Sequence, residues 1–380
     1  MFKTRVQHFS SRRGATLVLA ALLTVLMLCV VAFAVDVGLL NLSRAELQRT
    51  ADAAALAGAA RYMSGATAGE RIAAVRETAA EYVTLNPVLN SPTTVEMNNY
   101  NSPTGDVVVG YINFNDLANC TLELGDPNEF NAVAVTVHRS NAVNGEVPLF
   151  FARVMGRKSV NMHAAATAAL IRNVSGFRMP TTGERPPVLP IAARVNDWDA
   201  VPQNGQDKWS WDPEMERIKP GADGIRELVL FPQGTGSPGN YGTVNIGISA
   251  NSTSHLANQI SHGLSQMDLD FHGGELKLDA NGKLNLSGDT GVSAGIKDEL
   301  AAIAGQLRIL PLYNQLSGKG NNATYGIVKW GGVRIMSVTL TGNQRGVVVQ
   351  PSNVHFKGVV PGEPGGYHSD HVFSQPYLIR

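Results

Sequence analysis

Charge is scarce in this chain of 380 residues: Asp, Glu, Lys and Arg together make up 16% of it, against about 25% in an ordinary soluble domain. The 31 basic residues balance the 31 acidic ones, and they form no dense basic run. Because a nucleic-acid-binding protein needs a basic face to meet phosphates, the composition argues against that class. The two cysteines are too few for a disulfide framework or a thiolate zinc site.

Common enzyme motifs are also missing: the chain has no P-loop, no G-x-G-x-x-G and no H-E-x-x-H. The pattern G-x-S-x-G does occur, at Gly291–Gly295, with Ser293 in the position of a nucleophile. With 39 glycines in the chain such a match arises easily, and the region lacks the alternating strands and helices of a hydrolase. Ser293 fits a helix N-cap equally well. We therefore expect no enzyme, and keep an anchored serine hydrolase as the less favoured alternative.

Metal ligands are the next possibility. His368 and His371 flank Asp370 near the C-terminus, and further histidines stand at positions 255, 262 and 272. A metal ion needs three or four converging ligands, and a tail rich in Gly and Pro offers no rigid platform for them. A calcium loop over residues 279–289 lacks the glycine and glutamate positions of an EF-hand. We therefore expect no metal and no cofactor.

The most informative feature that is present is an apolar run of 21 residues from Ala15 to Val35. As a helix it measures about 31 Å, which matches the hydrocarbon core of a bilayer. The preceding segment, residues 1–14, contains four basic residues and no acidic one, and Asp36 follows the run directly. By the positive-inside rule, residues 1–14 are expected in the cytoplasm and everything from Asp36 onward outside it.

A cleaved signal peptide is the main alternative to this transmembrane helix. Ala32-Phe33-Ala34 has the A-x-A pattern of a signal peptidase site, so cleavage after Ala34 would release a secreted or periplasmic binding module that starts at Val35. The apolar run is longer than the usual 7–15 residues of a signal peptide. We favour the uncleaved anchor for that reason.

An Ala-rich helix is predicted next, within residues 36–63. Ser43 and Glu46 have the spacing of a capping box that would begin this helix, and Gly38 is the expected kink if it continues the apolar run. Small residues four apart would let another helix approach closely along one face; these helix-packing candidates are Ala54, Ala55, Gly58 and Ala59. Two interpretations stay open, a stalk without a partner and a helix that packs on another membrane-protein subunit.

The remainder is predicted to be α+β. A small extracytoplasmic α+β domain is expected over 66–172, with a helix over 66–85, strands over 106–112, 132–138 and 159–171, and a short helix over 147–155. Four prolines predict a linker over 173–190. A β-rich domain is expected over 191–360, and an irregular, exposed tail over 361–380.

Within the β-rich region the apolar patterns predict eight strands and two helices. A tight turn at Asn281-Gly282 would join two of the strands in a hairpin. The expected strands are 227–231, 243–249, 276–278, 284–286, 307–312, 325–329, 333–340 and 346–350, and the expected helices are 253–266 and 293–304.

The N-terminal module resembles that of the TadE/TadG-like proteins of Flp (Tad) pilus assembly. The resemblance rests on about 50 residues within 12–60: Arg12-Arg13-Gly14-Ala15, the apolar run, Asp36-Val37-Gly38, Glu46-Leu47-Gln48 and the block Asp52–Gly58. Residues 147–153, with Val147-Pro148 and Phe150–Arg153, also resemble a segment of the TadG-like proteins. Processed TadE-type pseudopilins carry Glu as the fifth residue after the cleaved Gly, whereas Leu19 occupies that place after Gly14. The uncleaved, TadG-like form is therefore favoured.

The resemblance implies a single-span protein of the cell inner (cytoplasmic) membrane whose bulk is periplasmic or extracellular. Its expected function is that of a membrane-anchored structural or interaction protein of the cell envelope, related to Flp pilus assembly. The expected partners are the cytoplasmic membrane, other pilus-assembly or envelope proteins and further copies of the chain, and not nucleic acid.

Overall fold

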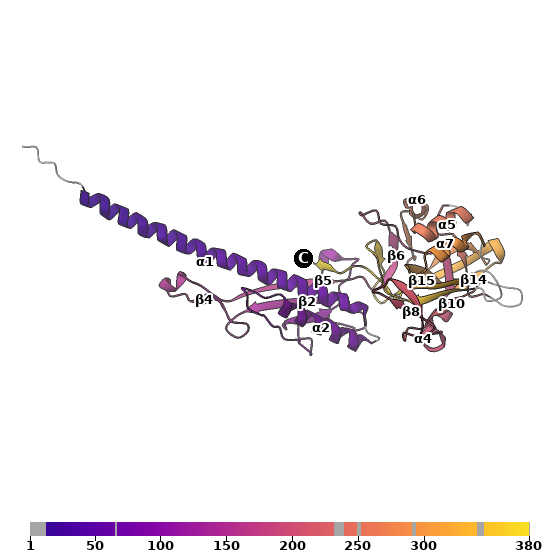
Figure 1. The fold of residues 1–380 in the computed structure, drawn as a ribbon, viewed down its shortest axis with the longest axis horizontal. Helices are drawn as coiled ribbons and strands as arrows, with labels where there is room; N and C mark the ends of the chain where they lie inside the picture. The colour runs from indigo at the N-terminus through magenta and orange to yellow at the C-terminus, as the bar shows by residue number, and fades with distance from the viewer. Residues whose placement is uncertain are drawn as a thin grey trace, which may run out of the picture.

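The computed structural model describes residues 13–64, 67–231, 239–248, 252–290, 294–339 and 346–379. A long helix, α1, leads into a sheet-containing part that we call the proximal lobe, which comprises residues 36–169 and the strand at 377–379. A distal lobe, residues 174–373, lies beyond it, so that the molecule is elongated (Figure 1). The α+β fold class predicted from the sequence is confirmed.

Helix α1 (Arg13–Ala60) runs without a break from the apolar run into the proximal lobe. At 1.5 Å per residue its 48 residues extend for about 72 Å. The helix continues through Gly38. The predicted capping box is wrong, because Ser43 lies inside the helix and donates its hydroxyl to the carbonyl of Leu39 at 2.8 Å. Glu46 instead accepts the backbone N–H of Leu89 at 2.6 Å. A short 3-10 helix, η1 (Arg61–Met63), follows α1.

The proximal lobe places two helices on one face of an antiparallel sheet. Helix α2 (Ala68–Leu85) is the one predicted over 66–85, and it begins at a capping box formed by Thr67 and Glu70. The sheet has the strand order β1 (Val107–Gly110), β2 (Ala132–Arg139), β5 (Met162–Ala169) and β21 (Tyr377–Ile379). The smaller elements are η2 (Leu117–Asn119), β3 (Val147–Pro148), η3 (Ala152–Met155) and β4 (Ser159–Val160).

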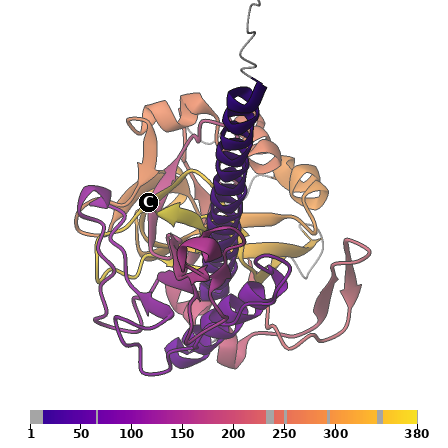
Figure 2. The ribbon, with the colours of Figure 1, turned by 90° about the vertical axis from the view of Figure 1, so that its left-hand side faces the viewer.

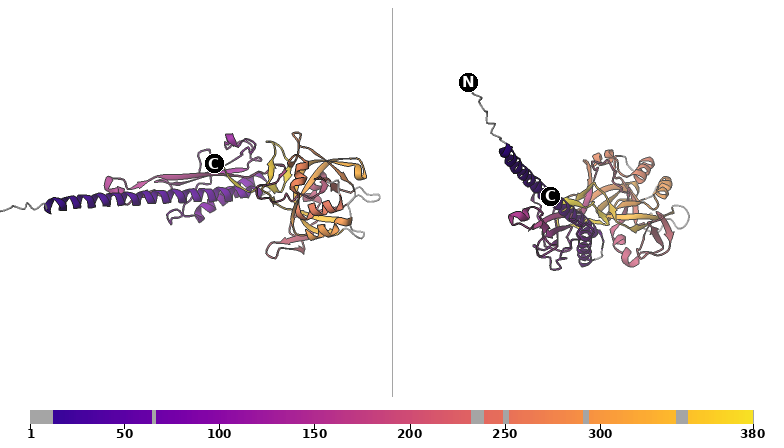
Figure 3. Two further views of the ribbon diagram at one scale, coloured as in Figure 1. Left: turned by 90° about the horizontal axis from the view of Figure 1, so that it is seen from above. Right: turned by 60° about the vertical axis from the view of Figure 1, so that its left-hand side comes forward.

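Alternating buried side chains along β2 and β5 explain why α1 and α2 pack on this face of the sheet. Every second residue of β2 from Val133 to Val137 is fully buried against the helices, and burial of a Val side chain contributes about 1.5–3 kcal/mol. The matching positions of β5 are alanines, which let α1 approach the sheet closely. The left view of Figure 3 shows magenta strands of the proximal lobe running alongside α1.

The helix predicted over 147–155 is mostly wrong. Val147 and Pro148 form strand β3, which pairs with β4, and only Ala152–Met155 form a 3-10 helix. The segment is a hairpin with a helical turn at its tip, because pairing of Val147 with Val160 holds its two ends together. Figure 1 shows this hairpin, near the label β4, as the part of the proximal lobe that extends farthest toward the apolar end of α1.

The distal lobe is built around a closed ring of five strands. The pairing runs from β15 to β13, β11, β7 and β14 and back to β15, and only β7 with β14 is parallel. Closure removes exposed strand edges. The strands of this lobe are β6 (Val174–Arg178), β7 (Ile191–Arg194), β8 (Trp209–Asp212), β9 (Arg217–Pro220), β10 (Leu228–Leu230), β11 (Tyr241–Val244), β12 (Glu275–Lys277), β13 (Leu284–Asp289), β14 (Leu307–Ser317), β15 (Ala323–Thr339), β16 (Gly346–Pro351), β17 (Val354–His355), β18 (Val359–Pro361), β19 (Ser369–Asp370) and β20 (Val372–Phe373).

Short helices and a separate hairpin surround the ring. The helices are α3 (Val195–Asp199), α4 (Val201–Asn204), α5 (Thr253–His262), α6 (Gln266–Phe271), η4 (Ala294–Ile296), α7 (Lys297–Ala302) and η5 (Gly320–Asn322). Apolar side chains of α5 and α7 pack with those of β14 and β15. Seen from the free end of α1, the β8–β9 hairpin projects from the rest of the lobe (Figure 2).

Three further predictions differ from the structure. Strands 325–329 and 333–340 are one long strand, β15, which changes partners along its length. Asn281-Gly282 do form a tight turn, but the two strands beside it diverge: β12 pairs with β6, and β13 pairs with β11 and β15. The helix predicted over 253–266 ends earlier, at His262, because Gly263 at φ +78° ends α5, and a separate helix, α6, begins at Gln266.

The linker and the tail also differ from expectation. The linker predicted over 173–190 contains β6, the central strand of a three-stranded sheet with β12 and β18, so that part of the prediction is wrong. The tail predicted as irregular over 361–380 contains β19, β20 and β21. Two of these lie in the distal lobe and the last completes the proximal sheet, which places the C-terminal end beside β5 (Figure 1).

Candidate functional site

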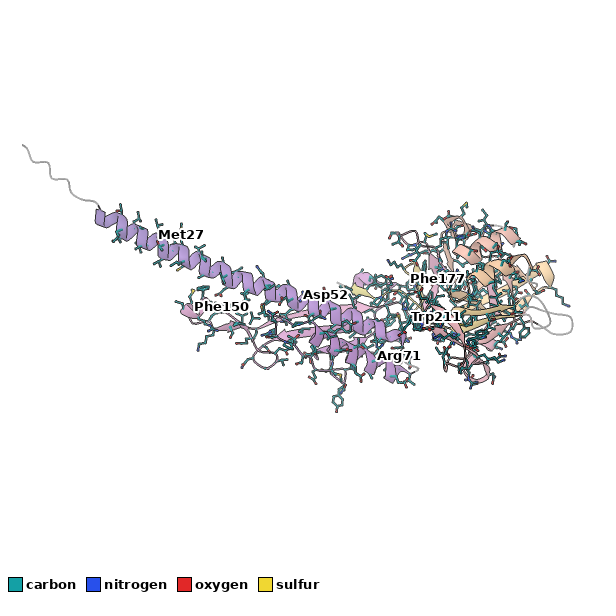
Figure 4. All side chains as sticks on the ribbon, in the orientation of Figure 1. Met27, Asp52, Arg71, Phe150, Phe177 and Trp211 are labelled. Carbon is teal, nitrogen blue, oxygen red and sulfur yellow. The ribbon has the colours of Figure 1, made fainter. Side chains whose placement is uncertain are left out.

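The apolar part of α1 stands clear of both lobes. From Leu17 to Val35 its large side chains are exposed along every face of the helix, and Figure 4 shows Met27 on this free stretch. A soluble helix buries at least one stripe of such residues. Among the described residues, α1 is the one helix long and apolar enough to cross a membrane.

Asp36 connects the end of this apolar stretch to the β3–β4 hairpin. Its carboxylate oxygens accept backbone N–H groups of Phe150 at 2.8 Å, Phe151 at 3.1 Å and Ala152 at 2.7 Å. The side chain is buried by these contacts. A carboxylate satisfies the free N–H groups at the start of a helical turn, and such charge-assisted bonds are stronger than neutral ones. Residues 150–152 of the β3–β4 hairpin are therefore held beside the end of the apolar stretch.

The small-residue stripe of α1 lies inside the proximal lobe. Ala54, Ala55 and Ala59 are fully buried in its core. A Cβ added at Gly58 would lie 3.2 Å from the Cβ of Ala79 on α2. The stripe thus gives close packing against α2 and the sheet of the same chain, and this face of the described helix is not open to another subunit.

A cleft of about 730 Å³ lies between the two lobes. Its lining includes Arg172, whose guanidinium donates to the carbonyls of Phe130 at 2.6 Å and Asn128 at 3.2 Å and lies 5.9 Å from the centre of the Tyr62 ring. Burial, followed by the charge of Arg71, lowers the pKa of Arg172 to about 10. The wall contributed by the C-terminal segment includes Glu363, Tyr367 and Asp370. Positive and negative groups thus line the cleft together.

The C-terminal segment is fixed within the distal lobe, and separate hydrogen bonds join the two lobes. Asp370 accepts a hydrogen bond from the indole of Trp198 at 2.9 Å and forms an ion pair with Lys329. Across the junction, the amide of Asn353 donates to the carbonyl of Met63 at 3.0 Å. The amide of Asn115 donates to the carbonyl of Gly362 at 3.2 Å. These last two bonds join the proximal lobe to the distal lobe.

The residues considered for catalysis or metal binding are dispersed. Ser293 lies outside the described residues. His371 contacts Asn353 at 2.9 Å, and His255 contacts the buried Asp268 at 2.7 Å. Within the described ranges, His, Cys, Asp and Glu form no group of three or more that could hold a metal ion. Asp279 accepts the N–H groups of Asn281 and Lys283, as in a tight turn.

Sequence reasoning missed the role of Asp36, which it used only as the charge that follows the span. Its partners lie more than 110 residues away, so no local pattern could identify them. The available signal was the segment Leu149–Lys158, which combines two adjacent phenylalanines with three basic residues and has no acidic one.

Comparisons with known families agree with the resemblance noted from the sequence. The family model Tad, described as Flp pilus-assembly TadE/G-like, matches residues 14–61, and the model Tad_C, described as Tad-like Flp pilus-assembly, matches residues 47–168. Together they cover α1 and the proximal lobe up to β5. No curated protein and no solved structure matches the chain.

Proposed function

We propose that this chain is a single-pass, membrane-anchored structural protein of the cell envelope that takes part in Flp pilus assembly. The observation that carries the proposal is the continuity of α1, which is both the exposed apolar stretch and the core helix of the proximal lobe. A membrane anchor of this kind fixes the proximal lobe to the bilayer without a flexible joint. The two family matches support the connection to Flp pili.

The orientation follows from the charges at the two ends of the apolar run. Four basic residues precede it and Asp36 follows it, so the N-terminus is cytoplasmic and both lobes are extracytoplasmic. The membrane that α1 crosses is the cytoplasmic (inner) membrane. The proximal and distal lobes correspond to the extracytoplasmic domains expected at 66–172 and 191–360. The proximal lobe, which the family models cover, supplies the pilus-related part of the function.

The uncleaved anchor is preferred over release after Ala34. The apolar run of 21 residues exceeds the usual 7–15 residues of a signal peptide, and α1 continues without a break through residues 32–36. The distal lobe, raised from the membrane by the proximal lobe, then presents the β8–β9 hairpin and the interlobe cleft to other envelope proteins or to further copies of the chain.

N-terminal sequencing of the native protein, together with alkaline washing of membranes, tests the anchor. An intact N-terminus in the washed membrane fraction is expected. A soluble chain that starts at Val35 would refute the anchor and make this a secreted protein, and a chain that starts at Ala15 would indicate processing of the pseudopilin type.

Topology needs a separate measurement. In spheroplasts, a membrane-impermeant maleimide should label Tyr100→Cys, because Tyr100 is fully exposed on the proximal lobe. The protein that keeps Tyr100 is the control, and it reports the background labelling of the native Cys120. Labelling of Tyr100→Cys only after lysis would reverse the proposed orientation.

A further inference from the structure

The tip of the β3–β4 hairpin exposes apolar and basic side chains side by side. Val154 is 92% and Met155 89% exposed, and Phe150 and Phe151 are about half exposed. Arg153, Arg157 and Lys158 are exposed in the same ten-residue stretch, 149–158, which contains no acidic residue. We call this stretch the hairpin tip. Contiguous exposed apolar groups of this kind mark an interaction surface.

The position of the hairpin tip relative to α1 is fixed by Asp36. The three N–H groups that Asp36 accepts belong to the tip itself. Asp36 follows directly on the 21 uncharged residues that end at Val35. Val154 is two residues beyond Ala152, whose N–H is bonded to Asp36. Chain geometry therefore keeps the Cα atoms of Ala152 and Val154 within about 7 Å of each other. Figure 4 shows Phe150 beside α1, between the labelled Met27 and Asp52.

We propose that the hairpin tip is a second membrane contact and inserts into the headgroup region of the same bilayer that α1 crosses. The four apolar side chains face the acyl chains, and Arg153, Arg157 and Lys158 lie at the lipid phosphates. This inference rests on the membrane anchor proposed above. It assigns the tip a lipid ligand with anionic headgroups.

A lipid surface fits the tip better than a protein partner does, for two reasons. First, the tip continues the apolar surface of α1, since Val35 and Val37 beside Asp36 are themselves exposed, so a bilayer that surrounds the span also meets the tip. Second, apolar groups bordered by Lys and Arg without any acidic residue are typical of segments that lie in the membrane interface.

Two contacts would fix the proximal lobe in a way that one helix cannot. A single span is free to rotate about its axis and to tilt. Insertion of the hairpin tip on one side of α1 removes rotation about the helix axis, because the tip cannot leave the interface without exposing its apolar side chains to water. The second contact thereby determines which side of the proximal lobe faces away from the membrane.

Spin labelling of the full-length protein in vesicles tests the inference. In a Cys29→Ala, Cys120→Ser background, single labels are placed at Val154→Cys, at Met27→Cys inside the span, and at Tyr100→Cys as the water-exposed control. The vesicles contain phosphatidylcholine and phosphatidylglycerol and no other protein. The readout is the accessibility of each label to oxygen, which concentrates in lipid, and to a water-soluble nickel chelate.

The expected result is oxygen-dominated accessibility at both 27 and 154 and nickel-dominated accessibility at 100. If the label at 27 is in lipid and that at 154 is in water, the second contact is refuted while the anchor stands. If both are in water, the anchor fails as well. If 154 is shielded only in cells that contain pilus proteins, the partner is a protein and the lipid assignment is wrong.

Charge reversal tests the basic residues separately. Arg157→Glu with Lys158→Glu should weaken the shielding of the label at 154 in vesicles with phosphatidylglycerol and leave it nearly unchanged in pure phosphatidylcholine. Arg217→Glu, an exposed position on the distal β9, is the matched control. Equal effects of the double variant in both kinds of vesicle would contradict a role for the basic residues in binding anionic lipid.

Discussion

The hydroxyl of Ser374 accepts the backbone N–H of Ile171 at 2.8 Å, although the two residues are 203 positions apart. Ile171 lies two residues after β5 of the proximal sheet, and Ser374 lies between β20 of the distal lobe and β21 of the proximal sheet. Within the distal lobe, the hydroxyl of Ser369 accepts the N–H of Val174, the first residue of β6, at 2.9 Å. The segment from β19 to β21 therefore crosses the junction between the lobes beside the covalent connection from β5 to β6.

Ser374→Ala should destabilise the junction. The side chain is fully buried, so its loss leaves the N–H of Ile171 without its partner, at a cost of about 1–3 kcal/mol. Thermal unfolding of the detergent-solubilised chain measures this. Ser317→Ala, at an exposed position of β14, is the control and should change the midpoint little. An unchanged midpoint for Ser374→Ala would show that water replaces the hydroxyl.

Gly58→Leu should destabilise the proximal lobe by overpacking. A Cβ at this position would already lie within 3.3 Å of Val133 on β2 and within 3.2 Å of α2, and extra methylenes in a packed core typically cost about 1–3 kcal/mol. Gly38→Leu is a matched control on the same helix, because a Cβ there has nothing within 4 Å. It should be neutral or slightly stabilising. Similar denaturation midpoints for the two variants would contradict the intrachain packing of this stripe.

Asp36→Ala should release the hairpin tip. Three backbone N–H groups lose their acceptor, so trypsin should cleave at Arg153 and Arg157 several-fold faster in detergent. Asp36→Asn keeps one acceptor oxygen and should lie between the wild type and Asp36→Ala. Glu77→Gln, on the exposed side of α2, controls for the change of charge. Cleavage at the wild-type rate in Asp36→Ala would mean that β3 and β4 alone hold the tip.

The buried Asp268 should make the distal lobe sensitive to acid. Burial alone would raise its pKa, but hydrogen bonds from Ser265, His255 and Gln259 outweigh burial and lower the pKa below its ordinary value. A lowered folded-state pKa means that the stabilisation is complete above the unfolded-state pKa, about 3.9, and disappears as the pH falls through the folded-state value.

Urea unfolding of the wild type and Asp268→Asn at a series of pH values measures this effect. The variant should be less stable at neutral pH, and the gap should narrow as the pH falls below about 4. Asp270→Asn, at an exposed position on the same helix, should show no such gap. A gap that stays constant down to low pH would mean that Asp268 contributes through its shape rather than its charge.

Local patterns in the sequence were sufficient for the long elements. The apolar run and the helix at 68–85 carry their signals within about 20 consecutive residues, and both form as predicted. The strands β19, β20 and β21 are two or three residues long, too short for alternation to be recognised. Their partners lie far away in the sequence, so only tertiary pairing reveals them.

The candidate site shows a second limit. The spacing of Ala54 and Gly58 indicates that something packs closely on α1, and α2 does so. Spacing alone cannot distinguish a helix of the same chain from one of another subunit. The bonds from Asp36 to residues 150–152 depend on a contact across more than 110 residues, which no composition or period encodes.

The place of β21 in the proximal sheet has a consequence for biosynthesis. The ribosome completes β5 about 200 residues before it reaches β21, and the whole distal lobe is made in between. The proximal sheet therefore gains its last strand only after the distal lobe has emerged. A chain interrupted within the distal lobe would leave β5 as a bare edge, open to chaperones and proteases.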